Sequence, residues 1–483
     1  MIVSRYEQRT IYETAVALMP DHKELLWEDW MLEVDSLLED RDLIGIVQTA
    51  LEKRCPKSAT LGRIGTPAEV VLRMLILKHR RDWSFEDLVR EVRANVVYRD
   101  FTRIGGQKVP DRSTLIKIAN YLGPDVIRAI HNRVRDLGVN RKVSAGKKMR
   151  VDTTVVETNI HYPTDSSLLG DGVRVLTRTM KRIQRLVGQT GTNLRDRTRS
   201  VKYKLIEIAR TSKAKAQENQ GKLKHAYEKL MTTTGRVIRQ ARTFTKEVRQ
   251  GIKRAATPIA QLVVDSLATY LEEICGLTKR VVEQTKARIV RGDTHYKDKV
   301  LSIFQPFTEA IRKGKAAKPT EFGKMVKIQE AEDQLIVDYE VFQKRPADAE
   351  LLIPSIEKHK EVYGVVPSLV AADAGFFSAK NEQEAQAAGV AKISIPSRTT
   401  RSEARRKHQK QRWFRRGQRW RVGCEGRISV IKRRHGLFRS RYKGESGMER
   451  WVGLGVIANN LTVIGNEIAK RRNRTKLAAE IVG

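Results

Sequence analysis

The sequence predicts an α/β protein in which a mixed sheet follows an all-helical N-terminal region. Three observations support this fold class. Apolar residues recur at helical spacing up to about residue 140, and a β-branched run over residues 147–162 marks the first strand. Further short apolar runs alternate with helical patterns after residue 320. Strands crossed by helices form an α/β sheet, and a long polar stretch between residues 165 and 290 predicts a helical insertion after the first strand.

The charge of the chain indicates a polyanionic partner. Its 483 residues carry 93 Lys and Arg against 56 Asp and Glu, a formal net charge of +37. Nucleic acid is the first candidate, because Lys and Arg contacts to phosphates release counterions, and a membrane surface is the second. No apolar run approaches about 18 residues, and the N-terminus lacks the apolar core of a signal peptide. At this length we expect roughly three domains.

Three cysteines, Cys55, Cys275 and Cys424, form no CxxC pair. An odd number without metal-ligand spacing argues against a disulfide framework and against a cysteine-based zinc site. A reducing compartment fits this pattern.

The N-terminal region, residues 1–140, is predicted to consist of short helices. The sequence TPAE at Thr66–Glu69 has the form of a capping box with Pro67 at the first helical position. SFED at Ser84–Asp87 indicates a second helix start, and VPDRSTL a third. Short basic helices with tight turns fit a helix-turn-helix-like DNA module, and the alternative is a helical bundle with a basic surface.

The stretch from Asp165 to about Val290 is predicted to form long helices. No proline occurs between Pro163 and Pro258, and sparse apolar residues recur at helical spacing among basic ones. We expect a hairpin of long helices without a compact core. Two interpretations remain open, a basic arm lying along DNA and a hairpin for dimerisation or spacing.

The C-terminal half is predicted to complete the sheet. We expect a strand hairpin over 324–331 and 333–342, a helix over 348–364 with Pro354 in its first turn, a strand over 368–373, a helix over 379–389 and a strand over 390–396. Residues 300–304 form an apolar run of uncertain type. With the first strand in front, the expected order is β-β-β-α-β-α-β-α.

Three acids in separate segments are the candidate catalytic residues. Asp152 lies inside the first strand, Asp373 ends an apolar run followed closely by Gly375, and Glu425 lies in a basic helical segment. If the strands of Asp152 and Asp373 are parallel neighbours, their carboxylates meet at one sheet edge. Carboxylates suit Mg²⁺, and two such ions can promote phosphodiester cleavage. The alternatives are a strand-edge aspartate, a turn cap and a solvated first-turn acid.

Two cations are predicted to share the helical stripe of Glu425. At about 100° per residue, Arg421 and Lys432 lie on the same side as this acid. They keep the carboxylate charged at neutral pH and can hold phosphate oxygens beside it. Because Gly423 and a second nearby glycine weaken the helix, we expect its start as late as Cys424.

The segment Thr400–Arg421 is predicted to be a basic loop that contacts DNA. Cations for phosphates alternate with aromatic rings for unpaired bases, and the candidate contacts are Arg415, Arg416, Trp413 and Trp420, with Phe414 between them. The alternative is a disordered, solvated basic run. His161 and Tyr162, after the first strand, either touch substrate or pack. The basic stretch Arg312–Lys324 either follows a DNA end or links to the next strand.

Several segments together resemble the DDE transposases of bacterial insertion sequences, in the insertion-sequence-4-like or insertion-sequence-5-like group. Arg421, Glu425 and Lys432 match the Arg-x3-Glu-x6-Lys signature, although Gln418 replaces the family's aromatic residue three positions before the arginine. VDTTVVETNIHYPTDSSLL and VAADAGFFSAKN resemble the segments of the two aspartates, which correspond to Asp152 and Asp373. TPAEVVLRMLILKH and WVGLGVIANNLTVIG resemble the N-terminal domain and the closing helix.

The resemblance implies a ribonuclease-H-like catalytic core with a mixed sheet. The expected domains are a DNA-binding helical domain over 1–140, the catalytic core over 147–170 and 290–465, a basic helical insertion over 171–289, and a basic tail over 466–483.

It also implies an enzyme that binds the terminal inverted repeats of its element in double-stranded DNA. Asp152, Asp373 and Glu425 would bind Mg²⁺, with Mn²⁺ as a substitute, for cleavage and for joining the 3′-OH to target DNA. We expect a homodimer on DNA, in the cytoplasm and associated with the bacterial nucleoid. The alternatives are an inactive or domesticated DNA-binding protein and a metal-dependent nuclease without strand transfer.

Overall fold

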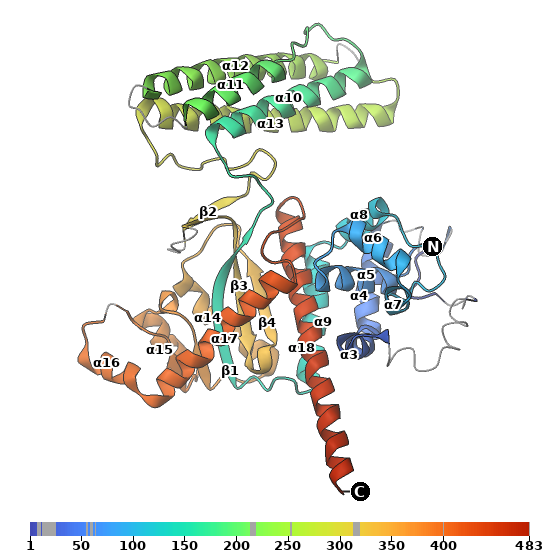
Figure 1. Ribbon diagram of the computed structural model, residues 1–483, viewed down its shortest axis with the longest axis vertical. Coiled ribbons are helices and arrows are strands. Elements are labelled where there is room, and N and C mark those ends of the chain that lie inside the picture. Colours follow the sequence, from blue (N-terminus) through green and yellow to red (C-terminus); the bar gives the residue numbers. More distant parts are fainter. Residues whose placement is uncertain are drawn as a thin grey trace. The chain divides into compact units, whose positions relative to one another are not determined.

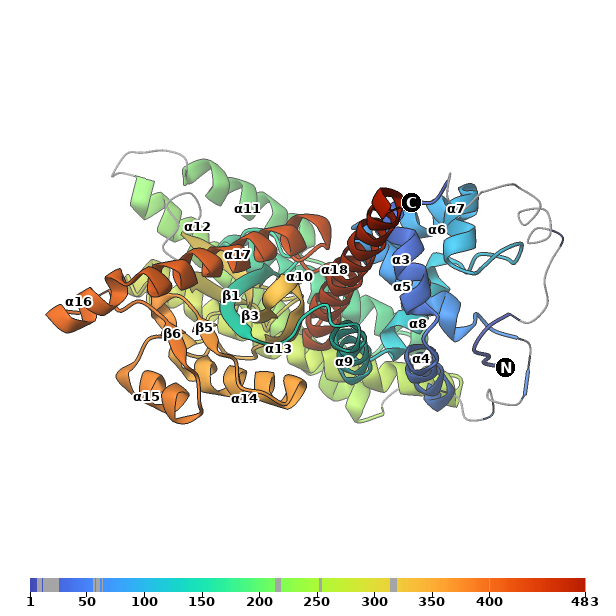
Figure 2. The same cartoon turned by 90° about the horizontal axis from the view of Figure 1, so that it is seen from below.

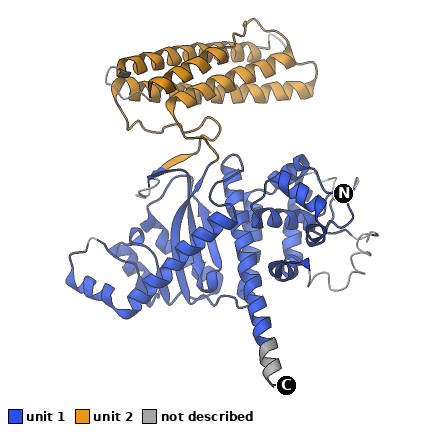
Figure 3. Cartoon of the chain, viewed as in Figure 1, with its two compact units in different colours: residues 1–158, 311–483 blue, residues 159–310 orange. Residues whose placement is uncertain are grey.

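The computed structural model describes residues 1–6, 11, 26–54, 57, 61–62, 64–212, 219–251, 254–312, 319–398 and 400–482. The chain forms two compact units, residues 1–158 with 311–483, and residues 159–310 (Figure 3). Within the described residues, no helix is long and apolar enough to cross a membrane.

The first unit is built on a six-stranded mixed sheet. Its strands are β1 (Lys148–Glu157), β2 (Glu309–Arg312), β3 (Thr320–Ala331), β4 (Ile336–Val341), β5 (Leu369–Ala371) and β6 (Lys392–Ser394). The order is β2-β3-β1-β5-β6, with β4 also paired to β3. The β1–β3 and β3–β4 pairs are antiparallel, whereas β1–β5 and β5–β6 are parallel. The predicted hairpin and parallel strands are present, and β2 is an additional strand that the sequence did not indicate.

Alternate residues of β1 face different partners. Met149 and Val151 are fully buried in a core shared with α14 (Leu352–Tyr363) and α15 (Ala379–Ala387). Because strand side chains alternate between faces, Arg150 and Asp152 point to the other side, where α17 (Arg412–Arg434) lies across the sheet (Figures 1 and 2). Pro354 lies in the first turn of α14, as expected.

The N-terminal helices share one core with the closing helix. They are α3 (Asp29–Leu38), α4 (Arg41–Arg54), α5 (Ala68–Arg80), α6 (Phe85–Ala94), α7 (Val96–Phe101), α8 (Arg112–Tyr121) and α9 (Pro124–Asn140). Four buried residues of α18 (Glu445–Val482) join this core, namely Leu454, Ile457, Leu461 and Ile464. Helix α18 continues through the residues of the predicted basic tail, 466–483, to Val482.

The predicted helix start at Ser84 is correct, and a capping box forms there. The Ser84 hydroxyl accepts the N–H of Asp87, and the Asp87 carboxylate accepts the N–H of Ser84. The box at Thr66 is wrong, because α5 begins at Ala68 with Pro67 in the cap position and no side-chain cap. Because Pro67 occupies the cap position, Thr66 lies one residue before it and does not cap the helix.

The second unit is a bundle of four helices, α10 (Asp165–Val187), α11 (Thr198–Thr211), α12 (Asn219–Arg249) and α13 (Pro258–Arg291). The expectation of a hairpin without a compact core is wrong, since all four helices bury apolar residues in one common core. The apolar run at 300–304 forms no strand, and two of its residues, Val300 and Ile303, pack into this core.

The predicted basic loop is also wrong, since its residues form α16 (Glu403–Lys410) and the first part of α17. Helix α17 begins at Arg412, well before the expected start near Cys424. Early anchoring explains this difference. Phe414 is buried, its carbonyl accepts the Ser394 hydroxyl at 2.9 Å, and a Cβ on Gly417 would lie 2.6 Å from the same side chain. Tertiary packing therefore outweighs the weak helix propensity of the glycines.

Candidate active site

Two of the candidate acids follow neighbouring parallel strands in matching positions. Strand β1 pairs with β5 so that Arg150 lies opposite Ala371. Asp152 lies two residues after Arg150, and Asp373 lies two residues after Ala371. Both acids are only partly exposed. Asp152 lies inside β1, and Asp373 follows the carboxyl end of β5. The parallel arrangement expected for these two acids is therefore present.

The backbone around Asp373 holds this carboxylate in place. Its Oδ1 accepts the N–H of Gly375 at 2.8 Å, which caps a short turn over residues 374–376. A second acid, Asp348, lies beside it, because a Cβ added to Gly375 would lie 3.0 Å from Asp348 Oδ2 and 3.1 Å from Asp373 Oδ1. The Thr153 hydroxyl donates to Asp348 Oδ1 at 3.1 Å. In the sequence, Asp348 stands out only as the first residue of the helix predicted over 348–364.

A buried ion pair fixes α17 to the sheet next to Asp152. Arg150 Nη2 lies 2.6 Å from Glu330 Oε1, and the two side chains are 6% and 0% exposed. The same guanidinium donates to the carbonyl of Trp420 at 2.5 Å and lies 4.7 Å from the centroid of its ring. Arg427, two turns further along α17 than Trp420, places its Nε 3.9 Å from Glu330 Oε1. The sequence signal for this network is a charge on a buried strand two residues before Asp152, and the sequence-based prediction did not include it.

Cys424 marks how close α17 comes to Asp152. Burial raises the pKa of the Cys424 thiol well above its ordinary value, and the negative charges of Glu330 and Asp152 raise it further. Arg150 and Arg421 oppose that rise. The turn of α17 that carries Glu425 therefore lies within electrostatic reach of Asp152. The buried thiol remains protonated and unreactive at neutral pH.

Glu425 forms an ion pair with Arg421, one turn before it. The Arg421 Nη1 to Glu425 Oε1 distance is 2.8 Å, and the two side chains are 16% and 55% exposed. The predicted stripe of Arg421 and Glu425 is therefore formed. Lys432 lies two turns further along the same helix and is partly exposed.

The candidate acids suit a divalent metal in chemical kind. Carboxylate oxygens are the ligands that Mg²⁺ prefers, and Asp152 and Asp373 approach from adjacent strands. Within the described part of the chain, however, no three His, Cys, Asp or Glu side chains are grouped closely enough to hold a metal ion. Glu425 is directed to Arg421 instead. The pair of aspartates thus provides the start of a site, and Glu425 belongs to no metal-binding group in the described arrangement.

The remaining predicted contacts have different surroundings. Arg415 and Arg416 are exposed on α17, whereas Trp420 is covered by the cations of Arg150 and Lys148. Trp413 is partly exposed and packs edge-on against His408 and Phe414. Phe414 is buried, so its ring is unavailable for base stacking.

His161 and Tyr162 belong to the second unit. His161 Nε2 lies 3.4 Å from the carboxylate of Asp171, and the ring of Tyr162 is 75% exposed. Residues 313–318 of the basic stretch Arg312–Lys324 lie outside the described residues, as does Cys55.

Gln418 replaces the family's aromatic residue and connects α17 to the strand of Asp373. Its Nε2 donates to the carbonyl of Ala372, which precedes Asp373, at 3.3 Å, and also to the carbonyl and hydroxyl of Ser394. The amide therefore supports the ends of β5 and β6 from the helix that carries Glu425. This position appeared in the sequence only as a departure from a signature.

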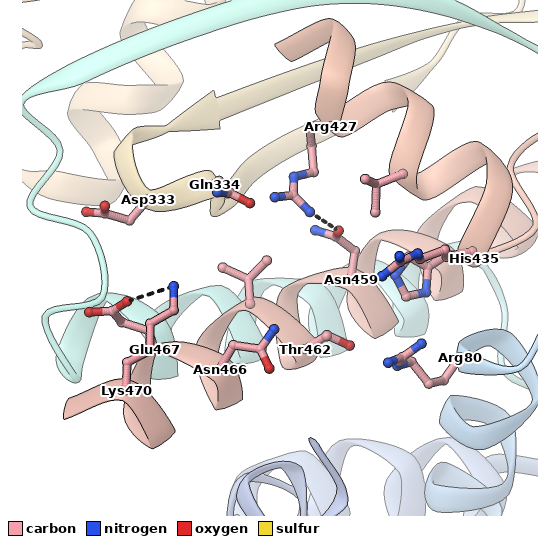
Figure 4. A pocket seen from close by; sticks show the side chains of 13 residues that line it. Arg80, Asp333, Gln334, Arg427, His435, Asn459, Thr462, Asn466, Glu467 and Lys470 are labelled. Atoms are coloured by element: carbon pink, nitrogen blue, oxygen red, sulfur yellow. Dashed lines mark hydrogen bonds and ion pairs between the residues drawn. The ribbon is translucent and has the colours of Figure 1, made fainter. Parts of the chain in front are cut away.

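A polar pocket lies along the other flank of α17 (Figure 4). It has a volume of about 240 Å³ and is lined by residues of α5, α17, α18 and the β3–β4 turn. Arg427 crosses toward it and donates to Asn459 Oδ1 at 2.9 Å. Four lining residues, Asp333, Gln334, Arg427 and Val430, also line a second hollow of about 520 Å³ that reaches Arg150 and Trp420. The flank is thus an open polar channel beside the anchored helix.

A mixed sheet with paired aspartates on parallel strands, crossed by a basic helix that carries a third acid, is the arrangement of an enzyme acting on phosphodiesters. Two family models match the chain. Residues 28–120 match a model described as Transposase domain (DUF772), and residues 279–461 match one described as Transposase DDE domain. The protein belongs to the DDE-type transposases of insertion sequences. No curated protein and no solved structure matches the chain.

The matched ranges differ in how they cover the candidate acids. Asp373 and Glu425 fall inside residues 279–461, whereas Asp152 lies outside both matches. The second unit also lies between the matches for most of its length. The assignment of Asp152 therefore depends on its place beside Asp373 in the sheet. Membership in this family indicates a phosphodiester-cleaving enzyme that acts on DNA and uses divalent metal ions.

Proposed function

We propose that this transposase binds the terminal inverted repeats of its own insertion sequence, cleaves the DNA at those ends and joins the freed 3′-OH to target DNA. The observation that carries the proposal is the parallel pairing of β1 with β5, since Asp152 and Asp373 each lie two residues beyond the paired Arg150 and Ala371. The anchoring of α17 next to them supports the inclusion of Glu425. A ribonuclease-H-like core is the fold that this family implies.

In this proposal Asp152, Asp373 and Glu425 hold Mg²⁺, and Mn²⁺ can replace it. When bound, the metal activates water or a 3′-OH and stabilises charge on the phosphate. The protein supplies the positions of the ligands. Gly375 fixes Asp373 by its N–H, and the buried Arg150 keeps α17 against the sheet.

Arg421 has two proposed roles. It neutralises Glu425 in the present arrangement, and it can turn to a DNA phosphate when Glu425 turns to the metal. Lys432 and the exposed Arg415 and Arg416 are proposed to hold further phosphates along α17. Trp413, Trp420 and His161 remain proposed DNA contacts. For Trp420, binding a base requires displacement of the cations that cover its ring.

The wider assignment follows from the resemblance. We place the chain in the insertion-sequence-4-like or insertion-sequence-5-like group, with residues 1–140 as the DNA-binding domain, 147–170 and 290–465 as the catalytic core and 171–289 as the insertion. Cutting and joining two ends together requires two active sites, so we propose a homodimer on DNA.

The test uses purified protein and labelled DNA carrying the flanking ends of its own gene, with Mg²⁺ or with EDTA. The proposal predicts nicks at the end boundaries and joined products, both dependent on metal. Cleavage without joining would identify a nuclease. Tight binding without cleavage under either Mg²⁺ or Mn²⁺ would contradict the proposal and identify a non-catalytic DNA-binding protein.

A further inference from the structure

One exposed face of α10 in the second unit carries positive charges only. Arg174, Arg178, Lys181, Arg182 and Arg185 are all exposed, and their spacing places them within about 100° of arc on the helix. The opposite side of α10 is buried in the core of the bundle. The stripe extends over about 16 Å at 1.5 Å per residue, which is the rise of about five base pairs.

Internal partners neutralise only two of these five cations. Arg174 donates to Asp171 and Lys181 to Asp196, each at 2.5 Å. Arg178, Arg182 and Arg185 make no hydrogen bond or ion pair with any residue that the structure describes. Three adjacent, uncompensated guanidinium groups repel one another and favour an anionic partner.

The same face is hollowed between α10 and the start of α11. One hollow of about 370 Å³ is lined by all five cations, and a second of about 600 Å³ is lined by Arg199 and Lys202 of α11. Both hollows share Arg174 and Thr198, so they form one continuous groove. The wall on the α11 side adds two more exposed cations to the stripe.

His161 lies at the second hollow and connects the groove to a buried acid. Asp171 is buried, its Oδ2 accepts no hydrogen bond, and His161 Nε2 lies 3.4 Å away. Burial raises the pKa of the Asp171 carboxyl, and the charges of His161 and Arg174 lower it. The Asp171 carboxylate is therefore enclosed in the protein, whereas the positive charges of the groove are exposed to solvent.

We propose that this groove, the α10–α11 groove, binds the phosphate backbone of duplex DNA. The stripe matches a row of phosphates in charge and length, and its arginines can bind phosphate oxygens in pairs. The groove extends the proposed function, since its ligand is the DNA on which the catalytic unit acts. Backbone contacts position the protein without reading sequence.

The exposed face of α13 in the same unit provides a matched control. Its exposed cations Lys279 and Lys286 alternate with exposed acids, Glu272, Glu273 and Glu283. Together with Arg291 they allow the removal of three positive charges from the same bundle without touching the groove. If the cations of α10 are only solvated and contact no DNA, removing three of them should change DNA binding no more than removing three cations from α13.

The experiment measures binding of the full-length protein to an end-bearing duplex in EDTA, by fluorescence anisotropy at several salt concentrations. Arg178→Ala, Arg182→Ala and Arg185→Ala are combined in one variant. Each lost phosphate contact lowers the salt slope by about 0.9, so we expect a slope smaller by about 2 to 3 and an affinity at least about tenfold weaker. Circular dichroism checks that the bundle remains helical.

Two controls decide the result. The triple change to Lys keeps the charge and is expected to keep the slope, and the triple α13 variant (Lys279→Ala, Lys286→Ala, Arg291→Ala) is expected to change it by less than about 1. Equal effects of the α10 and α13 variants would overturn the groove but not the transposase assignment. If the wild-type protein binds no DNA at all, both the groove and the proposed function are wrong.

Discussion

At the scale of single residues, the site depends on a buried ion pair as much as on the candidate acids. Arg150 joins Glu330 of β3 to the backbone of α17, and this keeps the helix of Glu425 beside Asp152. The sequence showed the three acids, because each lies in its own recognisable segment. It did not show Arg150, Asp348 or Gln418 as partners, since their contacts join segments far apart in the chain.

The first prediction concerns Arg150→Met, which leaves the buried Glu330 carboxylate with only the longer contact to Arg427, among the residues that the structure describes. Such a loss costs about 3 to 5 kcal/mol in free energy of unfolding. Burial already raises the pKa of Glu330, and the variant raises it further. The folded state then binds a proton more tightly than the unfolded chain, so the loss is largest at neutral pH and shrinks as pH falls through the raised pKa.

Urea unfolding at about pH 7.5 and about pH 5 measures both parts of this prediction. The double variant Arg150→Met with Glu330→Met removes the buried carboxylate as well and is expected to recover much of the stability. An equal loss at both pH values, or a double variant no more stable than the single one, would show that the pair does not stabilise this arrangement.

At the scale of elements, the sequence predicted those helices and strands whose formation depends on local backbone preferences. It did not predict those whose formation depends on tertiary packing. Ser84 forms its capping box, and the strands with β-branched or alternating residues are present. The basic segment before Arg421 has the composition of a loop, but its few apolar residues anchor it as helix. The bundle core was missed because its apolar residues are spread over four helices.

The second prediction compares Ser84 and Thr66, two hydroxyl residues that both precede a predicted helix in the sequence. Ser84→Ala removes a hydroxyl that accepts the N–H of Asp87 and is expected to cost about 1 kcal/mol in free energy of unfolding. Thr66→Ala removes no cap and is expected to change stability by less than about 0.5 kcal/mol. Denaturant titration of both variants checks the difference, and similar losses would mean that Thr66 does cap α5.

At the scale of the whole molecule, the family matches and the sheet bear on different candidate acids. The matches identify the transposase and include Asp373 and Glu425. The sheet supports the proposal of Asp152, because this residue lies two positions after Arg150, just as Asp373 lies two positions after Ala371, the partner of Arg150 in β5. The order of the segments along the chain made this core predictable, whereas the structure of the inserted bundle required knowledge of its packing.

The most direct test of the central claim is single-turnover cleavage of labelled end DNA by Asp152→Asn, with binding of the same DNA measured in EDTA. Loss of a metal ligand is expected to slow cleavage by more than about a hundredfold, with binding unchanged. Asp136→Asn, which removes an acid that pairs with the neighbouring Arg135, is expected to cleave normally. Cleavage by Asp152→Asn at the rate of this control would contradict the pairing of Asp152 with Asp373 as the catalytic centre.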